Sequence, residues 1–190
     1  MASRRINIDS TCRDPRGHVA RPGIDASLWH LPTTATPCFR KSWEDEYGSG
    51  KWSYMNGLHE LGRYSIIVGF CGFFKAHGAI LDVACGEGML QQKLAPMGYR
   101  RYLGIDLSEV ALAKAMFRAD EQTEFQLGNI ESFTPEGKFD TIIFNEISIT
   151  VPTPVAAIRR LACCLEPDRV MIASIWTSPP GRRKALQICA

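Results

Sequence analysis

From Ala79 onward, short apolar segments alternate with segments that have the periodicity of amphipathic helices. Strands that are apolar along their whole length are typical of parallel sheets covered by helices on both faces. The alternation therefore predicts an α/β fold with a mostly parallel sheet and helices on both faces. The expected strands are 79–83, 101–105, 124–127, 139–144 and 170–176, and the expected helices are 86–97, 108–119 and one that begins with Thr153 and Pro154.

The chain before this alternation divides into two parts. Residues 1–40 are rich in Pro, Arg, Thr and Ser, which predicts an irregular N-terminal tail. Residues 41–78 predict a helical lead-in or lid, with one helix that starts near Ser42 and a second over 54–75, separated by glycines. Residues 79–190 form the α/β core, so the chain is expected to be a single domain with a lead-in.

Composition narrows the class of protein. The formal net charge of +2 disfavours nucleic acid or an acidic membrane as the main partner. The most apolar stretch, residues 64–74, is shorter than the roughly 20 residues that cross a bilayer. The 7 cysteines include no CxxC pair, which argues against a disulfide framework and against a zinc site. We therefore expect a cytoplasmic protein with reduced thiols and no metal.

The segment ILDVACGEGML joins the first expected strand to the following helix and contains Gly86 and Gly88. In open parallel sheets, ligands bind beyond the carboxyl ends of the strands, where glycine lets a ligand approach the backbone. The second expected strand is followed by Asp106, whose carboxylate can accept both hydroxyls of a ribose. Charged hydrogen bonds of this kind contribute roughly 1.5–3 kcal/mol each. Together these residues predict a nucleoside ligand.

Two residues distinguish between nucleoside ligands. Gln91 stands where a dinucleotide site has the third glycine of G-x-G-x-x-G. The carboxylate of Asp82 would repel a pyrophosphate and attract an ammonium group. S-adenosylmethionine has an ammonium group, a sulfonium and no phosphate, so it fits better than NAD. Helix capping is the alternative role for both acids: Asp82 for the following helix, and Asp106 for the helix that starts at Ser108.

Four segments in order, ILDVACGEG, YLGIDLS, FQLGNIESF and FDTIIFNEIS, resemble the successive motifs of class I S-adenosylmethionine-dependent methyltransferases. The resemblance covers about residues 43–176 and implies a Rossmann-like sheet. KWSYMNGLHELGRY resembles the helical lead-in of small-molecule methylases of the ubiquinone-biosynthesis and nodulation N-methyltransferase kind. The resemblance implies methyl transfer from S-adenosylmethionine to a small-molecule acceptor by in-line displacement.

The resemblance also implies which residues bind the cofactor. Arg63 would pair with its carboxylate, Tyr54 would close over the site, Asp106 would bind the ribose, and Asn129 with Ile130 would meet the adenine. Around the methionine part would lie Asp82 and the loop that follows it. The full set is Tyr54, Arg63, Asp82, Ala84, Cys85, Gly86, Gly88, Asp106, Leu107, Asn129, Ile130 and Asn145.

Other interpretations apply to several of these side chains. Arg63 can pair with Glu60 at helical spacing instead of with the cofactor. Cys85 is better explained as a packing residue than as a nucleophile. The catalytic residue is unknown; His59 and Glu146 are weak candidates for a base, His59 being typical of a surface histidine and Glu146 equally of a satisfied buried acid.

The sequence departs from the family pattern in three places. Ala84 replaces the first loop glycine, and Asn129 replaces an acid at the adenine position. After residue 176 only TSPPGRRKALQICA remains, so we expect the last edge strands of the family fold to be absent. Strand 170–176 would then be an open edge, which a homodimer could cover. The alternatives are a cofactor-binding protein or partner subunit without transferase activity and, less favoured, a nicotinamide-dependent oxidoreductase.

Overall fold

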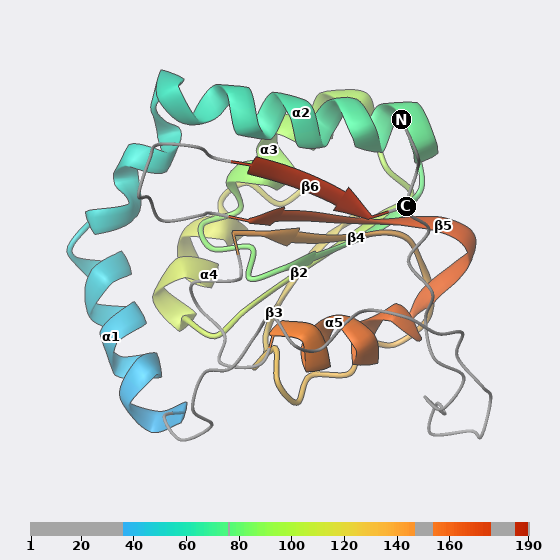
Figure 1. Cartoon of the computed structure of the whole chain (residues 1–190). Helices are drawn as coiled ribbons and strands as arrows, with labels where there is room; N and C mark the ends of the chain where they lie inside the picture. The colour runs from blue at the N-terminus through green and yellow to red at the C-terminus, as the bar shows by residue number, and fades with distance from the viewer. Residues whose placement is uncertain (1–35, 76, 147–153, 176–184, 190) are drawn as a thin grey trace.

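The computed structural model describes residues 36–75, 77–146, 154–175 and 185–189. The strands among them form one sheet in the order β3-β2-β1-β4-β5-β6, in which β1 to β5 run parallel and β6 is antiparallel (Figure 1). The predicted α/β fold with a mostly parallel sheet is confirmed, and all five expected strands are present. The strands are β1 Ala79–Val83, β2 Arg101–Asp106, β3 Thr123–Leu127, β4 Phe139–Asn145, β5 Leu165–Ile175 and β6 Ala185–Cys189.

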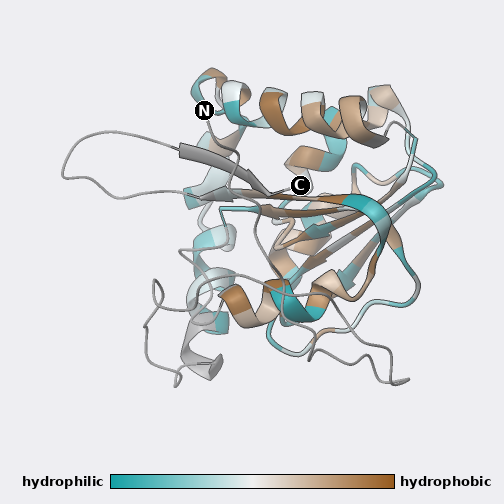
Figure 2. Cartoon of the chain, turned by 45° about the vertical axis from the view of Figure 1, so that its right-hand side comes forward, coloured by the Kyte–Doolittle hydropathy of each residue, from teal (hydrophilic) through white to brown (hydrophobic). Residues whose placement is uncertain are grey.

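Helices precede and connect these strands. α1 begins before the expected start at Ser42, and the expected N-cap Thr153 lies outside the described residues. Figures 1 and 2 show α2 and α3 on one side of the sheet and α5 on the other. The helices are α1 Thr36–Gly48, η2 Lys51–Asn56, α2 Leu58–Lys75, α3 Met89–Leu94, η3 Ala95–Met97, α4 Glu109–Met116 and α5 Pro154–Ala162.

The helix after β1 starts later than expected. Gly86 and Gly88 have φ values of 54° and 75°, which a right-handed helix excludes, so α3 begins only after Gly88. The helix after β2 starts as expected, because Ser108 is its N-cap and accepts the N–H of Ala111 at 3.1 Å. The two glycines therefore extend the loop at the carboxyl end of β1.

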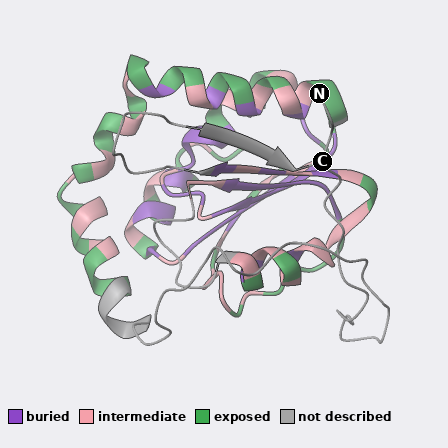
Figure 3. Cartoon of the chain, in the orientation of Figure 1, coloured by how far each residue is buried: buried purple, intermediate pink, exposed green. Residues whose placement is uncertain are grey.

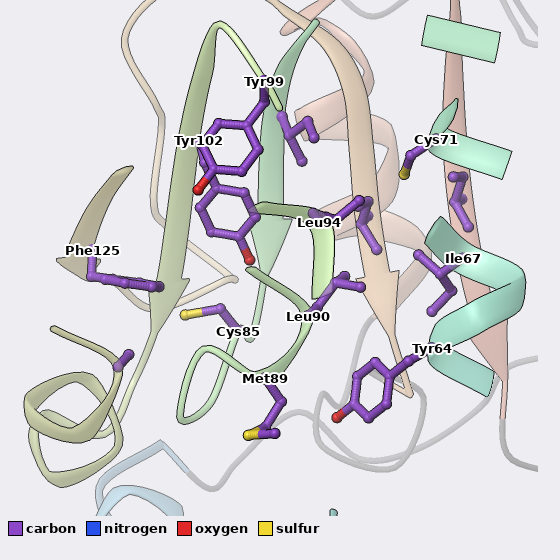
Figure 4. Close-up of a cluster of buried hydrophobic side chains, with 14 of the residues drawn as sticks. Tyr64, Ile67, Cys71, Cys85, Met89, Leu90, Leu94, Tyr99, Tyr102 and Phe125 are labelled. Carbon is purple, nitrogen blue, oxygen red and sulfur yellow. The ribbon is translucent and has the colours of Figure 1, made fainter. Parts of the chain in front are cut away.

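The core lies on both faces of the sheet. β1 is buried along its whole length, and β2 and β4 are buried except at one end (Figure 3). Under α2, Leu90 and Leu94 of α3 lie between Ile67 and the ring of Tyr102 (Figure 4). On the other face, Leu161 of α5 packs among apolar strand residues. This two-sided burial explains the nearly continuous apolar character of the strands.

α2 is continuous over 18 residues despite Gly62, Gly69 and Gly72. Each helical glycine costs about 1 kcal/mol relative to alanine. Burial of Tyr64, Ile67 and other residues of its inner face offsets this cost. In the part of the chain that the structure describes, no helix is both long and apolar enough to span a bilayer.

The expectation of an open edge at 170–176 is wrong. β6 pairs antiparallel with β5, from Met171 opposite Cys189 to Ile175 opposite Ala185. The expectation assumed that a crossover helix must precede any further strand, but an antiparallel neighbour needs only a short connection. A single strand therefore occupies the edge where we expected none, and an uncovered β5 edge no longer argues for a homodimer.

Candidate functional site

The loop from β1 to α3 lies at the carboxyl edge of the sheet and has three residues with positive φ: Ala84 (60°), Gly86 and Gly88. A Cβ on Gly86 would lie 2.9 Å from Oη of Tyr47, and one on Gly88 would lie 3.1 Å from Cζ of Phe125. Both glycines are therefore required by conformation and by space. Ala84 adopts the left-handed conformation where the family pattern has glycine, at a cost of roughly 1–2 kcal/mol.

Asp106 connects this loop to the end of β2. Its Oδ2 accepts the N–H of Gly86 at 2.8 Å, and its Oδ1 accepts the N–H of Ser108 at 2.9 Å. Burial raises the pKa of Asp106, although these backbone hydrogen bonds favour the charged form. A carboxylate has about four acceptor positions, so acceptor capacity remains for a ligand. Because Ser108 is the N-cap of α4, Asp106 is not needed as its cap. Leu107 follows it, half-buried.

Asp82 is the second buried carboxylate of the site, 1% exposed at the end of β1. The hydroxyl of Tyr102 donates to its Oδ2, whereas Oδ1 has no hydrogen-bond partner among the described residues. Burial raises the pKa of Asp82 to about 7. Its neighbour is a tyrosine on β2 and not the start of α3, so helix capping does not account for it. An unpartnered buried oxygen is an acceptor that a ligand could satisfy.

Arg63 of α2 reaches the ends of β4 and β5 with its side chain 9% exposed. Its Nη1 donates to Oδ1 of Asn145 at 2.8 Å and lies 3.3 Å from Oε2 of Glu146. Its Nε and Nη2 donate to Oε2 of Glu60 at 3.1 and 2.7 Å. The alternative pairing with Glu60 is therefore present, together with contacts to two residues of the predicted site. Ser174 of β5 also donates to Oδ1 of Asn145, at 2.7 Å.

The expected adenine side lies after β3. Oδ1 of Asn129 accepts the N–H of Glu131 at 2.9 Å, a local turn that occupies part of its acceptor capacity. The carbonyl of Ile130 accepts a hydrogen bond from Arg160 of α5. The N–H of Gly128 donates to the carbonyl of Asp106 at 2.9 Å, which joins this turn to the end of β2.

Two expected residues lie nearer the surface. Tyr54 is 44% exposed and stacks on His59, whose side chain is 64% exposed. Burial, together with the carboxylates of Glu146 and Glu60, raises the pKa of Tyr54. Burial also raises the pKa of the Cys85 thiol well above its ordinary value, which agrees with a packing role.

Sequence reasoning missed the contribution of α1. Its Glu44 accepts hydrogen bonds from Oγ of Ser108 at 2.7 Å and from the N–H groups of Glu109 and Val110 at 2.9 and 3.1 Å. These bonds fasten α1 to the start of α4. Tyr47, one turn later, thereby lies against Gly86, and burial and the nearby Asp106 raise its pKa. The spacing of an acid and an aromatic three residues apart on one helix face was the available signal.

Comparison with known proteins fits this geometry. Residues 74–184, more than half of the chain, match the model of a family described as a methyltransferase domain. The ubiquinone biosynthesis O-methyltransferase of Azoarcus sp. (strain BH72) is 34% identical over 124 residues, which are 62% of this chain and 52% of that protein. The chain thus spans about half the length of the curated relatives it matches.

Solved structures of methyltransferases share the fold. The N-methyltransferase NodS of Bradyrhizobium japonicum WM9, in complex with S-adenosyl-L-homocysteine, has a TM-score of 0.65 at 21% identity and covers 72% of each chain. The magnesium protoporphyrin IX methyltransferase of Synechocystis PCC 6803, with bound S-adenosylmethionine, has a TM-score of 0.60 at 24% identity, over 75% of this chain and 78% of that one. With the family match, these likenesses show that the chain belongs to the methyltransferase-domain family.

Proposed function

We propose that this chain binds S-adenosylmethionine at the carboxyl ends of β1 and β2 and transfers its methyl group to a small-molecule acceptor. The observation that carries the proposal is the pair of buried carboxylates on either side of the Gly86 loop. Asp82 has an unpartnered oxygen suited to an ammonium donor, and Asp106 keeps free acceptor positions suited to ribose hydroxyls. Solved relatives with bound S-adenosylmethionine or S-adenosylhomocysteine support the same ligand.

The remaining residues take roles consistent with this placement. Ala84, Cys85, Gly86 and Gly88 would line the methionine part, and Asn145 would lie beside it. Leu107, Asn129 and Ile130 would surround the adenine, and Arg63 would bind the cofactor carboxylate. Tyr54 and, from α1, Tyr47 would shield the site from water. The placement of β1 between β2 and β4, and the closeness of Tyr47 to Gly86, support these roles.

When bound, the cofactor supplies an activated methyl group on its sulfonium. The chain therefore has to hold the acceptor in line with that group, and orientation of this kind can contribute roughly 7–11 kcal/mol. For an acceptor that loses a proton, Glu146 is the better candidate base, because it lies beside Arg63 in the site whereas His59 faces solvent. The modest net charge of +2 supports a small molecule over a nucleic acid as acceptor, and a cytoplasmic location belongs to the same proposal.

Isothermal titration calorimetry tests the ligand. We expect S-adenosylhomocysteine to bind and NAD not to bind. Asp106→Asn should weaken S-adenosylhomocysteine about ten- to a hundredfold, because charged hydrogen bonds are lost. Glu121→Gln, the same chemical change at an exposed position, is the control and should bind normally. Binding of NAD in place of S-adenosylhomocysteine would overturn the proposal.

Transfer is tested separately with S-adenosylmethionine labelled on its methyl group and a panel of small hydroxyl, amine and thiol acceptors. We expect label to move to at least one acceptor class. Tight binding of S-adenosylhomocysteine with no transfer to any of them would instead indicate a cofactor-binding protein or partner subunit.

A further inference from the structure

We propose that Glu146 pairs with Arg63 in the ligand-free chain, at the position that the cofactor carboxylate would take. Cofactor binding then displaces Glu146 and frees it for the methyl acceptor. The inference rests on the proposed function, in which Arg63 binds that carboxylate. It concerns the order of events at the site: the candidate base would become free only after the cofactor has bound.

Among the described residues, every donor of Arg63 faces a partner. A guanidinium has five N–H groups. Two are directed to Glu60, one to Asn145 and one to Sδ of Met55 at 3.3 Å. The remaining side of Nη1 faces Oε2 of Glu146 at 3.3 Å. Among the described residues these contacts use the whole guanidinium, so a second carboxylate can bind Arg63 only by displacing a present partner.

Of the two carboxylates that contact Arg63, Glu146 is the easier one to displace. Glu60 is buried and accepts two hydrogen bonds from Arg63 one turn later on α2, so moving Glu60 away from Arg63 would break both bonds. Glu146 makes the longer contact, and its side chain is 15% exposed. The Glu146 backbone is fixed, since its N–H donates to the carbonyl and Oγ of Ser174 at 3.0 and 2.9 Å. Displacement therefore requires only a side-chain rotation.

Repulsion among the carboxylates around Arg63 favours the displacement of Glu146. Two carboxylates already share one guanidinium, so a third negative group in this partly buried cluster raises the repulsion among them. Displacing Glu146 relieves that repulsion. A carboxylate released from a guanidinium is also a better proton acceptor. Glu146 can then take the proton of the acceptor while the acceptor's lone pair bonds to the methyl carbon and sulfur keeps the electrons of the broken bond.

The test compares two ligands on Glu146→Gln. S-Adenosylhomocysteine carries the carboxylate, and 5′-methylthioadenosine carries the same nucleoside and thioether without it. We expect Glu146→Gln to bind S-adenosylhomocysteine about three- to tenfold more tightly than the unmodified chain, because the competing charge is gone, and to leave the affinity for 5′-methylthioadenosine unchanged. Glu121→Gln should change neither affinity.

A second variant guards against misfolding. Glu146 has φ of 58°, a conformation that aspartate tolerates better than most residues, so Glu146→Asp should fold. Its shorter side chain would reach Arg63 poorly, so it should also bind S-adenosylhomocysteine more tightly. In methyl transfer, Glu146→Gln should lower both KM for S-adenosylmethionine and kcat, whereas Glu146→Asp should lower KM and keep part of kcat.

The outcomes separate the two proposals. If the unmodified chain does not bind S-adenosylhomocysteine, the proposed function fails and the inference fails with it. If it binds, but Glu146→Gln and Glu146→Asp leave that affinity unchanged or weaken it, the inference alone is overturned. Equal tightening toward both ligands also overturns it, because the effect would then not involve the carboxylate.

Discussion

Replacing Asp82 by asparagine should stabilise the ligand-free protein at pH 8 but hardly at pH 5. Burial raises the pKa of Asp82 from 3.8 to about 7, against the lowering effect of the Tyr102 hydrogen bond. At about 1.4 kcal/mol per pKa unit, the ionised side chain weakens the fold by roughly 4 kcal/mol above pH 7. Asparagine removes the charge but buries an amide N–H where Oδ1 has no partner, at a cost of about 1–3 kcal/mol. The expected net gain at pH 8 is about 1–3 kcal/mol.

The sign follows from proton binding. Between about pH 4 and pH 7 the unfolded chain has already lost the Asp82 proton while the folded chain keeps it. The contribution of Asp82 to stability is therefore complete below pH 4 and is lost as the pH rises toward 7. Asparagine does not titrate, so the difference between the variant and the unmodified chain should grow by roughly 3 kcal/mol from pH 5 to pH 8.

Urea unfolding followed by far-ultraviolet circular dichroism measures this difference at both pH values. Comparing the two chains at each pH cancels the contribution of every other titrating group that the substitution leaves unchanged. A stability difference that is the same at pH 5 and pH 8 would refute the assignment of a raised pKa to Asp82. Asp45→Asn, on the exposed side of α1, is the matched control and should show no such pH dependence.

Two further predictions concern the loop and the lead-in. Gly86→Ala should lower stability by roughly 1–2 kcal/mol and weaken binding of S-adenosylhomocysteine, because φ is 54° and the new Cβ would meet Tyr47. Gly69→Ala, in open space on α2, should instead raise stability by up to about 1 kcal/mol. Thermal unfolding and calorimetry measure these effects, and equal effects of the two substitutions would contradict the geometry. Glu44→Ala should cost about 1 kcal/mol and speed limited proteolysis within α1, because it removes the hydrogen bonds that fasten α1 to the start of α4. Unchanged cleavage would count against this docking.

The fold was predictable because its strands are buried on both faces and therefore read as apolar segments. The errors arose at two places that the apolar pattern does not describe. The start of α3 depends on the positive φ of Gly86 and Gly88, which a helical pattern does not reveal. β6 was missed because a strand of only five residues shows little periodicity. Its pairing with β5 is also a long-range contact. The pairing of the described C-terminal strand thus depended on topology more than on local pattern.

The strand-end acids and loop glycines of the candidate site could be recognised in the sequence, but the hydrogen-bond partners of those acids could not. Asp82 pairs in register with Gly104, and Tyr102 lies two residues before Gly104 on the same face of β2. That diagonal contact depends on register, which the sequence does not state. Gly104 leaves room for Phe125, because a Cβ on Gly104 would lie 2.6 Å from that ring. The hydrogen bond from Tyr102, which lowers the pKa of Asp82 against the effect of burial, therefore follows from strand pairing.

The charges of the site come from two separate parts of the chain. Both buried acids belong to strand ends within the family match over 74–184, whereas Glu44, Tyr47 and Arg63 lie before it. Arg63 is the cation that faces Asn145 and Glu146, and Glu44 fixes the helix that brings Tyr47 to Gly86. In the proposed function, the matched region would supply the acceptors for the nucleoside and the ammonium group, while the lead-in would supply the partner of the cofactor carboxylate and the cover. We therefore expect substitutions at Asp82 or Asp106 to alter binding of the nucleoside and ammonium parts of the cofactor, and substitutions at Arg63 to alter binding of its carboxylate.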